Sequence, residues 1–192
     1  MRIIAGTHRG RILRAPSGQA TRPTAERTRE ALFNMLAHAP WAPSLEGARV
    51  LDLFAGSGAL GLEALSRGAA FALFVETEAA ARGVLRDNIE GLSLFGHTRI
   101  HRRDATDLGR KPAGLGAPFD LVFADPPYRQ GLLERSLPNL AAGGWITPQA
   151  LIVAECAAEE EPALPPACTL MESRTYGAAK LLILQGGAHD AG

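Results

Sequence analysis

The sequence predicts an α/β domain built on a doubly wound, mostly parallel sheet, and three observations support this fold class. From Arg49 onward, short apolar runs alternate with stretches of helical length and spacing. The first of these runs leads into a glycine-rich turn, Ala55-Gly56-Ser57-Gly58. The last two runs are separated only by residues 175–178, which suit a hairpin and leave no room for a crossover helix. Alternating strands and helices form βαβ units, whose right-handed crossovers give a parallel sheet covered on both faces.

The elements of the domain follow in chain order. Short runs rich in apolar residues between turn signals predict strands, and apolar residues recurring three or four positions apart predict helices. The predicted strands are 49–54, 70–76, 98–103, 119–124, 150–156, 168–174 and 179–185. The predicted helices are 58–68, 78–94 and 130–141, with a short one near 105–110. The last strand is expected to be antiparallel because it follows a hairpin turn.

An N-terminal extension precedes the domain. Residues 2–5 and 11–13 are predicted to pair as a β-hairpin around the turn 6–10, and a helix is predicted from about Thr24 to His38. We therefore divide the chain into an extension over 1–40, the main domain over 45–186 and a tail over 187–192.

The extension differs in charge from the rest of the chain. Residues 1–29 contain seven arginines and one acidic residue, a net charge of +6, and the remainder therefore carries −6 within a formal total of zero. A basic extension on an acidic body favours contact with a polyanion, although arginines on a solvated tail would give the same count. The use of arginine alone favours phosphate contacts, because the guanidinium group binds anions bidentately. The arginines expected to contact the polyanion are Arg9, Arg11, Arg22, Arg27 and Arg29.

Composition excludes several classes of protein. The 192 residues are 46% hydrophobic and include no apolar run of membrane-spanning length. The start of the chain lacks the apolar core of a signal peptide, and two cysteines are too few for a disulfide framework. No cluster of Cys, His and carboxylates has the spacing of a metal site. We expect a cytoplasmic protein that needs no metal.

The glycine turn predicts a site for a nucleoside-like cofactor. Gly56 and Gly58 can adopt positive φ and leave room for a ligand against the backbone. The spacing also fits an NAD site, but Asp52 would repel pyrophosphate and attract a cationic amino-acid moiety. Glu76 and Asp104 end the next two strands, where carboxylates can bind ribose hydroxyls and an adenine amino group, although single carboxylates there more often cap helices. The expected cofactor residues are Asp52, Phe54, Gly56, Ser57, Gly58, Glu76, Asp104 and Ala105.

A tetrad, Asp125-Pro126-Pro127-Tyr128, directly follows the fourth predicted strand. The Asp125 carboxylate and the Pro126 carbonyl can accept hydrogen bonds from the two N–H groups of a planar amine. Tyr128 can stack on the aromatic ring that carries this amine. The expected catalytic residues are Asp125, Pro126 and Tyr128. A rigid turn with a packed tyrosine is the plainer alternative. Paired with the glycine turn, the tetrad predicts a methyltransferase that uses S-adenosylmethionine (SAM) on an exocyclic amine.

These motifs are similar to those of the bacterial 16S ribosomal RNA guanine-N2 methyltransferases (RsmD-like), and the resemblance covers nearly the whole chain. The arginine-rich N-terminal pattern is its most specific part, since many amino-methylating enzymes share the tetrad and the glycine turn. Glu78 and the loop 157–167, rich in Glu and Pro, depart from the pattern. The matching segments are 2–6 with 9–11, 21–24 with 27–34, 52–58, 75–76, 125–128 and 176–177.

The resemblance implies a Rossmann-like class I SAM-dependent methyltransferase with a seven-stranded sheet. It implies methylation of N2 of one guanine in small-subunit ribosomal RNA, within an assembled or partly assembled subunit. The polyanion expected to contact the five arginines named above is then RNA. Nothing in the sequence requires more than a monomer. The tetrad would also serve N6 of adenine in nucleic acid or, less suitably, a protein glutamine. A rival from another class is a SAM-binding ribosome assembly factor without catalysis.

Overall fold

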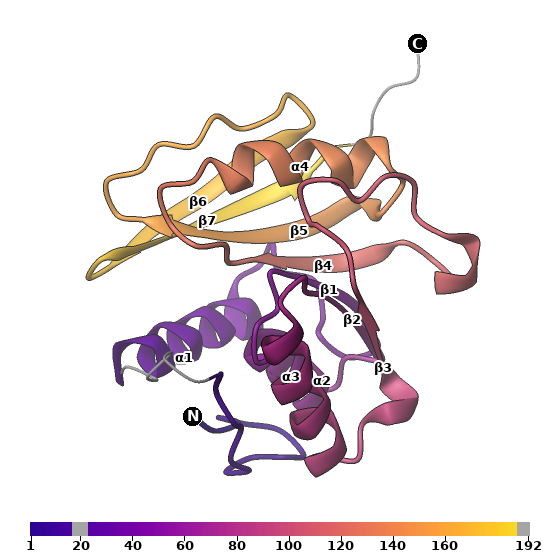
Figure 1. Cartoon of the computed structure of the whole chain (residues 1–192). Helices are drawn as coiled ribbons and strands as arrows, with labels where there is room; N and C mark the ends of the chain where they lie inside the picture. Colours follow the sequence, from indigo (N-terminus) through magenta and orange to yellow (C-terminus); the bar gives the residue numbers. More distant parts are fainter. Residues whose placement is uncertain (17–22, 188–192) are drawn as a thin grey trace.

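A computed structural model describes residues 1–16 and 23–187 and confirms the predicted α/β fold class (Figure 1). The sheet has seven strands in the order β3-β2-β1-β4-β5-β7-β6. The strands are β1 (Arg49–Leu53), β2 (Phe71–Val75), β3 (Thr98–His101), β4 (Phe119–Ala124), β5 (Ile146–Ala157), β6 (Cys168–Tyr176) and β7 (Ala179–Gly186). The α-helices are α1 (Pro23–His38), α2 (Ala59–Ser66), α3 (Ala79–Gly91) and α4 (Leu132–Ala142), and two 3₁₀ turns are η1 (Phe95–His97) and η2 (Ala113–Leu115).

The pairing of the strands follows the prediction. Strands β1 to β5 pair in parallel with one another, whereas β7 is antiparallel to both β5 and β6. Gly177, in the turn between β6 and β7, has a φ of 60°, a left-handed conformation that glycine adopts without strain. β7 thus lies between two strands that precede it in the chain.

Two local predictions differ from the structure. The short helix expected near 105–110 is absent, because the Asp104 carboxylate accepts bonds from the backbone N–H and the hydroxyl of Thr106 and forms a local turn. Strand β5 begins at Ile146, earlier than predicted. Pro148 breaks the strand pattern in the sequence, but it lies where the pairing of β4 with β5 shifts register, and proline is tolerated at such irregularities.

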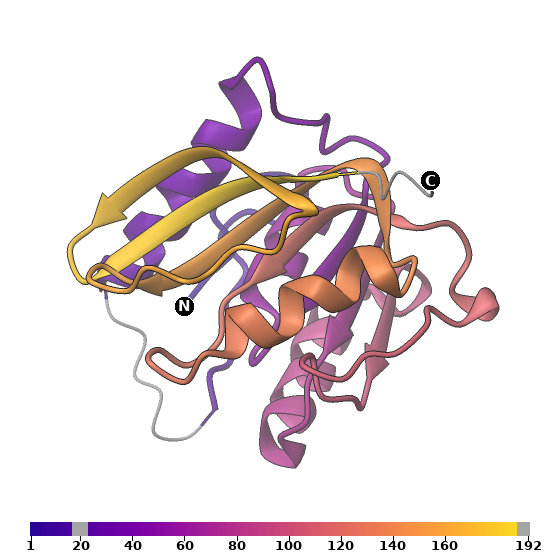
Figure 2. The same cartoon turned by 90° about the horizontal axis from the view of Figure 1, so that it is seen from above.

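Helices cover both faces of the sheet. Figure 1 shows α1, α2 and α3 on one face and α4 on the other, and Figure 2 shows α4 in front of the sheet with α1 behind it. The central strands β1 and β4 are almost entirely buried, as expected for parallel strands between two helical layers. The two halves of the core lie on either side of these strands. In the described part of the chain, no helix is long and apolar enough to span a membrane.

The N-terminal extension is packed against the domain. Its predicted hairpin forms around an antiparallel bridge between Arg2 and Ile12. The fully buried Glu63 of α2 accepts bonds from the backbone N–H groups of Ile4 (2.8 Å) and Ala5 (3.0 Å). Residues of the hairpin and of α1 also join the core beneath the sheet, among them Ile3, Leu13, Leu32, Phe33 and Leu36. The extension therefore shares its core with the main domain.

Candidate functional site

The predicted site residues gather at the carboxyl ends of the central strands. The glycine turn follows β1, Glu76 follows β2 and the tetrad follows β4. Because β1 pairs with both β2 and β4, the glycine turn lies between Glu76 and Asp125. The strand order also reverses between β1 and β4, which is where open α/β sheets bind their ligands.

Each glycine of the turn has its own physical role. Gly56 has a φ of 55°, and a Cβ placed on it would meet nothing nearer than 4.0 Å, so the space beside it is open. Gly58 has a φ of 81°, and its Cβ would lie 2.3 Å from Leu85 Cδ1. A Cβ on Gly61 would lie 2.4 Å from Phe74 Cε1. Gly56 thus leaves room for a ligand, while Gly58 and Gly61 let α2 approach the sheet.

Glu76 is joined directly to the glycine turn. Its Oε2 atom accepts the backbone N–H of Gly56 at 2.8 Å, and its Oε1 atom accepts the N–H of Glu78 at 2.7 Å. These bonds fix the half-buried carboxylate and leave it further acceptor capacity toward the open side of the turn. Glu78 caps α3 by accepting a bond from the backbone N–H of Ala80.

Asp52 lies beneath the turn and is 2% exposed. Its Oδ2 atom accepts the backbone N–H of Gly61 at 2.9 Å. Burial raises its pKa to about 8, partly opposed by the Gly61 bond and reinforced by the charge of Glu76. The structure therefore gives Asp52 a buried position that supports α2, with a carboxyl that is mostly protonated near neutral pH and no surface that opens toward a ligand.

Phe54 and Ser57 flank the turn differently. Phe54 has a φ of 59°, a conformation that is uncommon for a bulky residue and concentrated at functional sites. Ser57 is buried, with Oγ 3.8 Å from the Met1 sulfur, so the extension reaches the cofactor turn. Its backbone carbonyl accepts a bond from Asn88 of α3 at 2.9 Å.

Asp104 and Ala105 follow β3, on the far side of Glu76. The Oδ1 atom of Asp104 accepts bonds from Thr106 N at 2.8 Å and Thr106 Oγ1 at 2.7 Å, which lowers its pKa. The carboxylate is exposed, whereas the Ala105 side chain is buried in the core half that contains α4. The Glu76 N–H donates to the carbonyl of His101 at 3.2 Å and so links this segment to β2.

The tetrad places its polar groups beside the glycine turn. The Asp125 side chain reaches solvent, yet the protein packed around it desolvates the carboxyl and, with the charges of Glu155 and Asp52, raises its pKa. Pro126 is buried and fixes the backbone that follows. Tyr128 is half-buried, and its hydroxyl donates a hydrogen bond to Glu155 of β5.

Glu155 is a site residue that sequence reasoning missed. It lies in the buried strand β5 beside the tetrad, where its neighbour Ala154 pairs with Ala124. Burial raises its pKa, and the bond from Tyr128 opposes that shift. A glutamate in the otherwise apolar run 150–157 was the available signal, since charged residues are rarely buried without a partner.

The structure separates the expected RNA-contacting arginines. Arg9, Arg11 and Arg27 are exposed, and Arg11 donates to the carbonyl of Gly91 at 2.5 Å. Arg29 is 8% exposed and donates to the Arg2 carbonyl at 2.7 Å, and burial lowers its pKa. We therefore withdraw Arg29 as an expected RNA contact. Arg22 lies outside the described residues.

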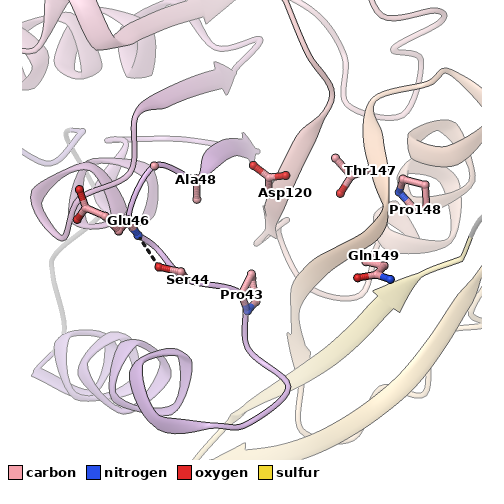
Figure 3. Close-up of a pocket in the computed structure, with 9 residues that line it drawn as sticks. Pro43, Ser44, Glu46, Ala48, Asp120, Thr147, Pro148 and Gln149 are labelled. Atoms are coloured by element: carbon pink, nitrogen blue, oxygen red, sulfur yellow. Dashed lines mark hydrogen bonds between the residues drawn. The ribbon is translucent and has the colours of Figure 1, made fainter.

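A cavity of about 530 Å³ opens at the opposite end of the central strands, near where they begin (Figure 3). Asp120, Ala48 and Gln149 line it near the starts of β4, β1 and β5. It contains none of the residues expected to bind cofactor or substrate, so the candidate site is the one at the carboxyl ends of the strands.

Comparison with known proteins agrees with this geometry. The family model described as "Conserved hypothetical protein 95" matches residues 1–185. Ribosomal RNA small subunit methyltransferase D of Escherichia coli (strain K12) is 42% identical over 178 residues, 92% of this chain and 85% of that protein. The protein of the same name from Haemophilus influenzae is 34% identical over 186 residues, 96% of this chain and 93% of that protein.

A solved structure supports the same relationship. The structure of yhhF from Escherichia coli superposes with a TM-score of 0.84 at 41% identity, covering 98% of this chain and 99% of that chain. The chain therefore belongs to the ribosomal RNA small subunit methyltransferase D family, within the class I methyltransferases that use SAM.

Proposed function

We propose that this protein transfers a methyl group from SAM to the exocyclic N2 amine of one guanine in small-subunit ribosomal RNA, within an assembled or partly assembled subunit. The observation that supports this most is the position of Asp125 and Tyr128 beside the glycine turn, on strand ends that pair with each other. The names of the similar proteins support ribosomal RNA of the small subunit as the substrate class.

The residues of the turn fit the cofactor. Gly56 borders open space, and Glu76, held by two backbone bonds, has acceptor capacity for ribose hydroxyls. Asp104, which follows β3 and is exposed, would accept a hydrogen bond from the adenine amino group. When bound, SAM supplies a methyl group on a sulfonium centre, which is a strong electrophile.

The tetrad then has to orient a weak nucleophile. The lone pair of an aromatic amine is delocalised into its ring, which makes the amine a weak nucleophile. The Asp125 carboxylate and the Pro126 carbonyl would accept hydrogen bonds from its two N–H groups and favour the pyramidal form of the amine, which attacks the methyl group. Tyr128 would stack on the base, which contributes about 1–3 kcal/mol. The raised pKa of Asp125 also suits it to accept the proton that the amine loses.

Mass spectrometry of nucleosides tests the proposal. Small subunits from cells lacking the enzyme would be incubated with the protein and labelled SAM, with naked ribosomal RNA as a second substrate. We expect N2-methylguanosine, formed faster on the subunits. If N6-methyladenosine formed instead, the acceptor would be adenine and not guanine. If label appeared in protein but not in RNA, RNA would not be the substrate.

The variant Asp125→Ala separates catalysis from binding. We expect at least a hundredfold loss of methylation with RNA and SAM binding retained, because the variant removes an acceptor needed mainly at the transition state. Wild-type activity in this variant would contradict the role of Asp125. If the protein were instead an assembly factor without catalysis, wild-type protein would bind subunits and methylate nothing.

A further inference from the structure

The loop that follows β5 is bonded to Arg129, the residue directly after the tetrad. Of its three consecutive glutamates, Glu159 and Glu160 accept bonds from Arg129, and Glu161 accepts one from Lys180. Glu159 accepts a bond from Arg129 Nε at 2.9 Å, and Glu161 accepts one from Lys180 Nζ at 2.6 Å. Glu160 accepts hydrogen bonds from two backbone N–H groups. This segment had no assigned role in the sequence.

Glu160 uses both carboxylate oxygens. Oε1 accepts the N–H of Arg129 at 2.9 Å, and Oε2 accepts the N–H of Ala157 at 2.8 Å. Arg129 directly follows the tetrad and has a φ of 59°, which a non-glycine residue keeps only where surrounding bonds determine it. The carboxylate therefore joins the end of β5 to the backbone immediately behind Tyr128.

Glu155 binds Tyr128 at the hydroxyl end of its side chain. It accepts the Tyr128 hydroxyl, so the ring is fixed at its tip by β5 and at its backbone by Glu160. A cavity of about 10 Å³ lies between the tetrad and these residues, about the space of one water molecule, so the two segments are closely packed.

We propose that Glu155 and Glu160 are positioning residues, which hold Tyr128 and the tetrad backbone in the geometry that orients the target base. This inference rests on the proposed function for its catalytic consequence. Neither glutamate needs to touch the base or the cofactor. Small displacements of a positioned group can cost up to about a hundredfold in rate, so an effect on kcat is expected.

A matched pair of glutamine variants tests Glu160. Glu160→Gln and Glu161→Gln each remove one charge from adjacent positions without changing shape. Gln offers a single carbonyl oxygen, which suffices for Lys180 but cannot accept both backbone N–H groups at Glu160. We expect kcat to fall about tenfold in Glu160→Gln and to stay within twofold in Glu161→Gln. Equal kcat values in the two variants would overturn the role of Glu160.

A double-mutant cycle tests Glu155. Glu155→Ala and Tyr128→Phe should each lower kcat about tenfold at saturating SAM, and the double variant should lose no more than either single variant, because both remove the same bond. Glu155→Gln, which keeps an acceptor for the hydroxyl, should recover most of the activity. SAM affinity by calorimetry and the thermal midpoint should stay close to wild type. Multiplicative losses, or no loss in Glu155→Ala, would overturn the role of Glu155.

A measurement without catalysis distinguishes failure of this inference from failure of the proposed function. Amide hydrogen exchange at Arg129 should be faster in Glu160→Gln than in wild type and unchanged in Glu161→Gln. If the wild-type protein methylated no RNA, the proposed function would be wrong, but exchange at Arg129 would still show whether Glu160 holds this backbone. Unchanged exchange at Arg129 in Glu160→Gln would overturn the inference even in an active enzyme.

Discussion

Gly56 and Gly58 show how single residues in one turn can be required for different reasons. Both have positive φ, but only Gly58 is crowded by the core, whereas Gly56 borders open space. The spacing of the glycines predicts the turn, because positive φ and close approach are local needs. Which glycine faces the core and which faces a ligand depends on where Leu85 and Phe74 pack, and the motif alone does not specify this.

Alanine substitutions should separate these two roles. A left-handed alanine costs about 1–2 kcal/mol, and at Gly58 a buried clash adds about 1–3 kcal/mol. We therefore expect urea denaturation to show a larger loss of stability for Gly58→Ala than for Gly56→Ala. Calorimetry should show weaker SAM binding in Gly56→Ala, which remains folded. Equal losses of stability would contradict the crowding of Gly58.

The burial of Asp52 predicts that the stability of the wild-type protein depends on pH in a way that the stability of Asp52→Asn does not. Its folded pKa of about 8 lies above the value of about 3.9 in an unfolded chain, so the folded state holds a proton that the unfolded state releases. Stability contributed by this proton is present below pH 4 and is lost as the pH rises toward 8.

Asp52→Asn keeps an acceptor for Gly61 N but does not titrate. Without cofactor, wild type should lose up to about 1.4 kcal/mol of unfolding free energy per pH unit relative to Asp52→Asn between pH 5 and 7. Urea denaturation of both proteins at these two pH values measures the difference. A constant difference would show that the Asp52 pKa is not raised.

Arg29 shows what residue-level reasoning overlooked. It lies three and four positions before Leu32 and Phe33, and all three side chains are buried on one face of α1. Helical spacing could have placed Arg29 on that face. Glu155 and Glu160 were harder to assign, because their partners Tyr128 and Arg129 come from a distant part of the chain and meet them only in the folded sheet.

At the scale of elements, all seven strands and the long helices were predicted from apolar patterns and turn residues. These signals are local, and a buried parallel sheet makes them strong. The errors occur where a contact overrides the pattern. A side-chain bond at Asp104 replaces a helix, and the register shift beside Pro148 permits a longer β5. The docking of the hairpin on α2 was not predicted, because Glu63 reads as an ordinary helical glutamate.

Loss of Glu63 should detach the hairpin from α2. The buried carboxylate accepts Ile4 N and Ala5 N and pairs with Arg67 at 2.7 Å, so Glu63→Ala should cost about 3–5 kcal/mol. Urea denaturation measures this cost, and trypsin should cut the hairpin arginines faster. As a control, Glu26→Ala breaks the exposed pair with Arg2 and should cost at most about 1 kcal/mol. Similar losses in both variants would contradict the anchoring role.

At the scale of the whole molecule, the positively charged N-terminal hairpin is held in a fixed place on the domain. The hairpin that bears Arg9 and Arg11 is bonded to α2 and α3, and Met1 contacts Ser57 of the cofactor turn. The basic surface is therefore fixed relative to the site. This arrangement supports the proposed RNA contacts, because phosphate bonds made there would orient the substrate toward the tetrad.

The salt dependence of RNA binding should count these contacts. If Arg9, Arg11, Arg22 and Arg27 each bind one phosphate, affinity for single-stranded RNA should fall about fiftyfold between 50 and 200 mM salt. Each alanine variant among them should reduce the slope of log affinity against log salt by about 0.7. Arg29→Ala should leave the slope unchanged, because its guanidinium is buried. Salt-independent affinity would contradict the proposed RNA surface.

The place of β7 between β5 and β6 also has a consequence for biosynthesis. β7 fills an interior position although it is the last strand to be made. Until residues 179–186 leave the ribosome, β5 and β6 each present an unpaired edge, and exposed edges favour association with other chains. Translation that stalls before Ala179 should therefore leave nascent protein prone to aggregate and dependent on chaperones.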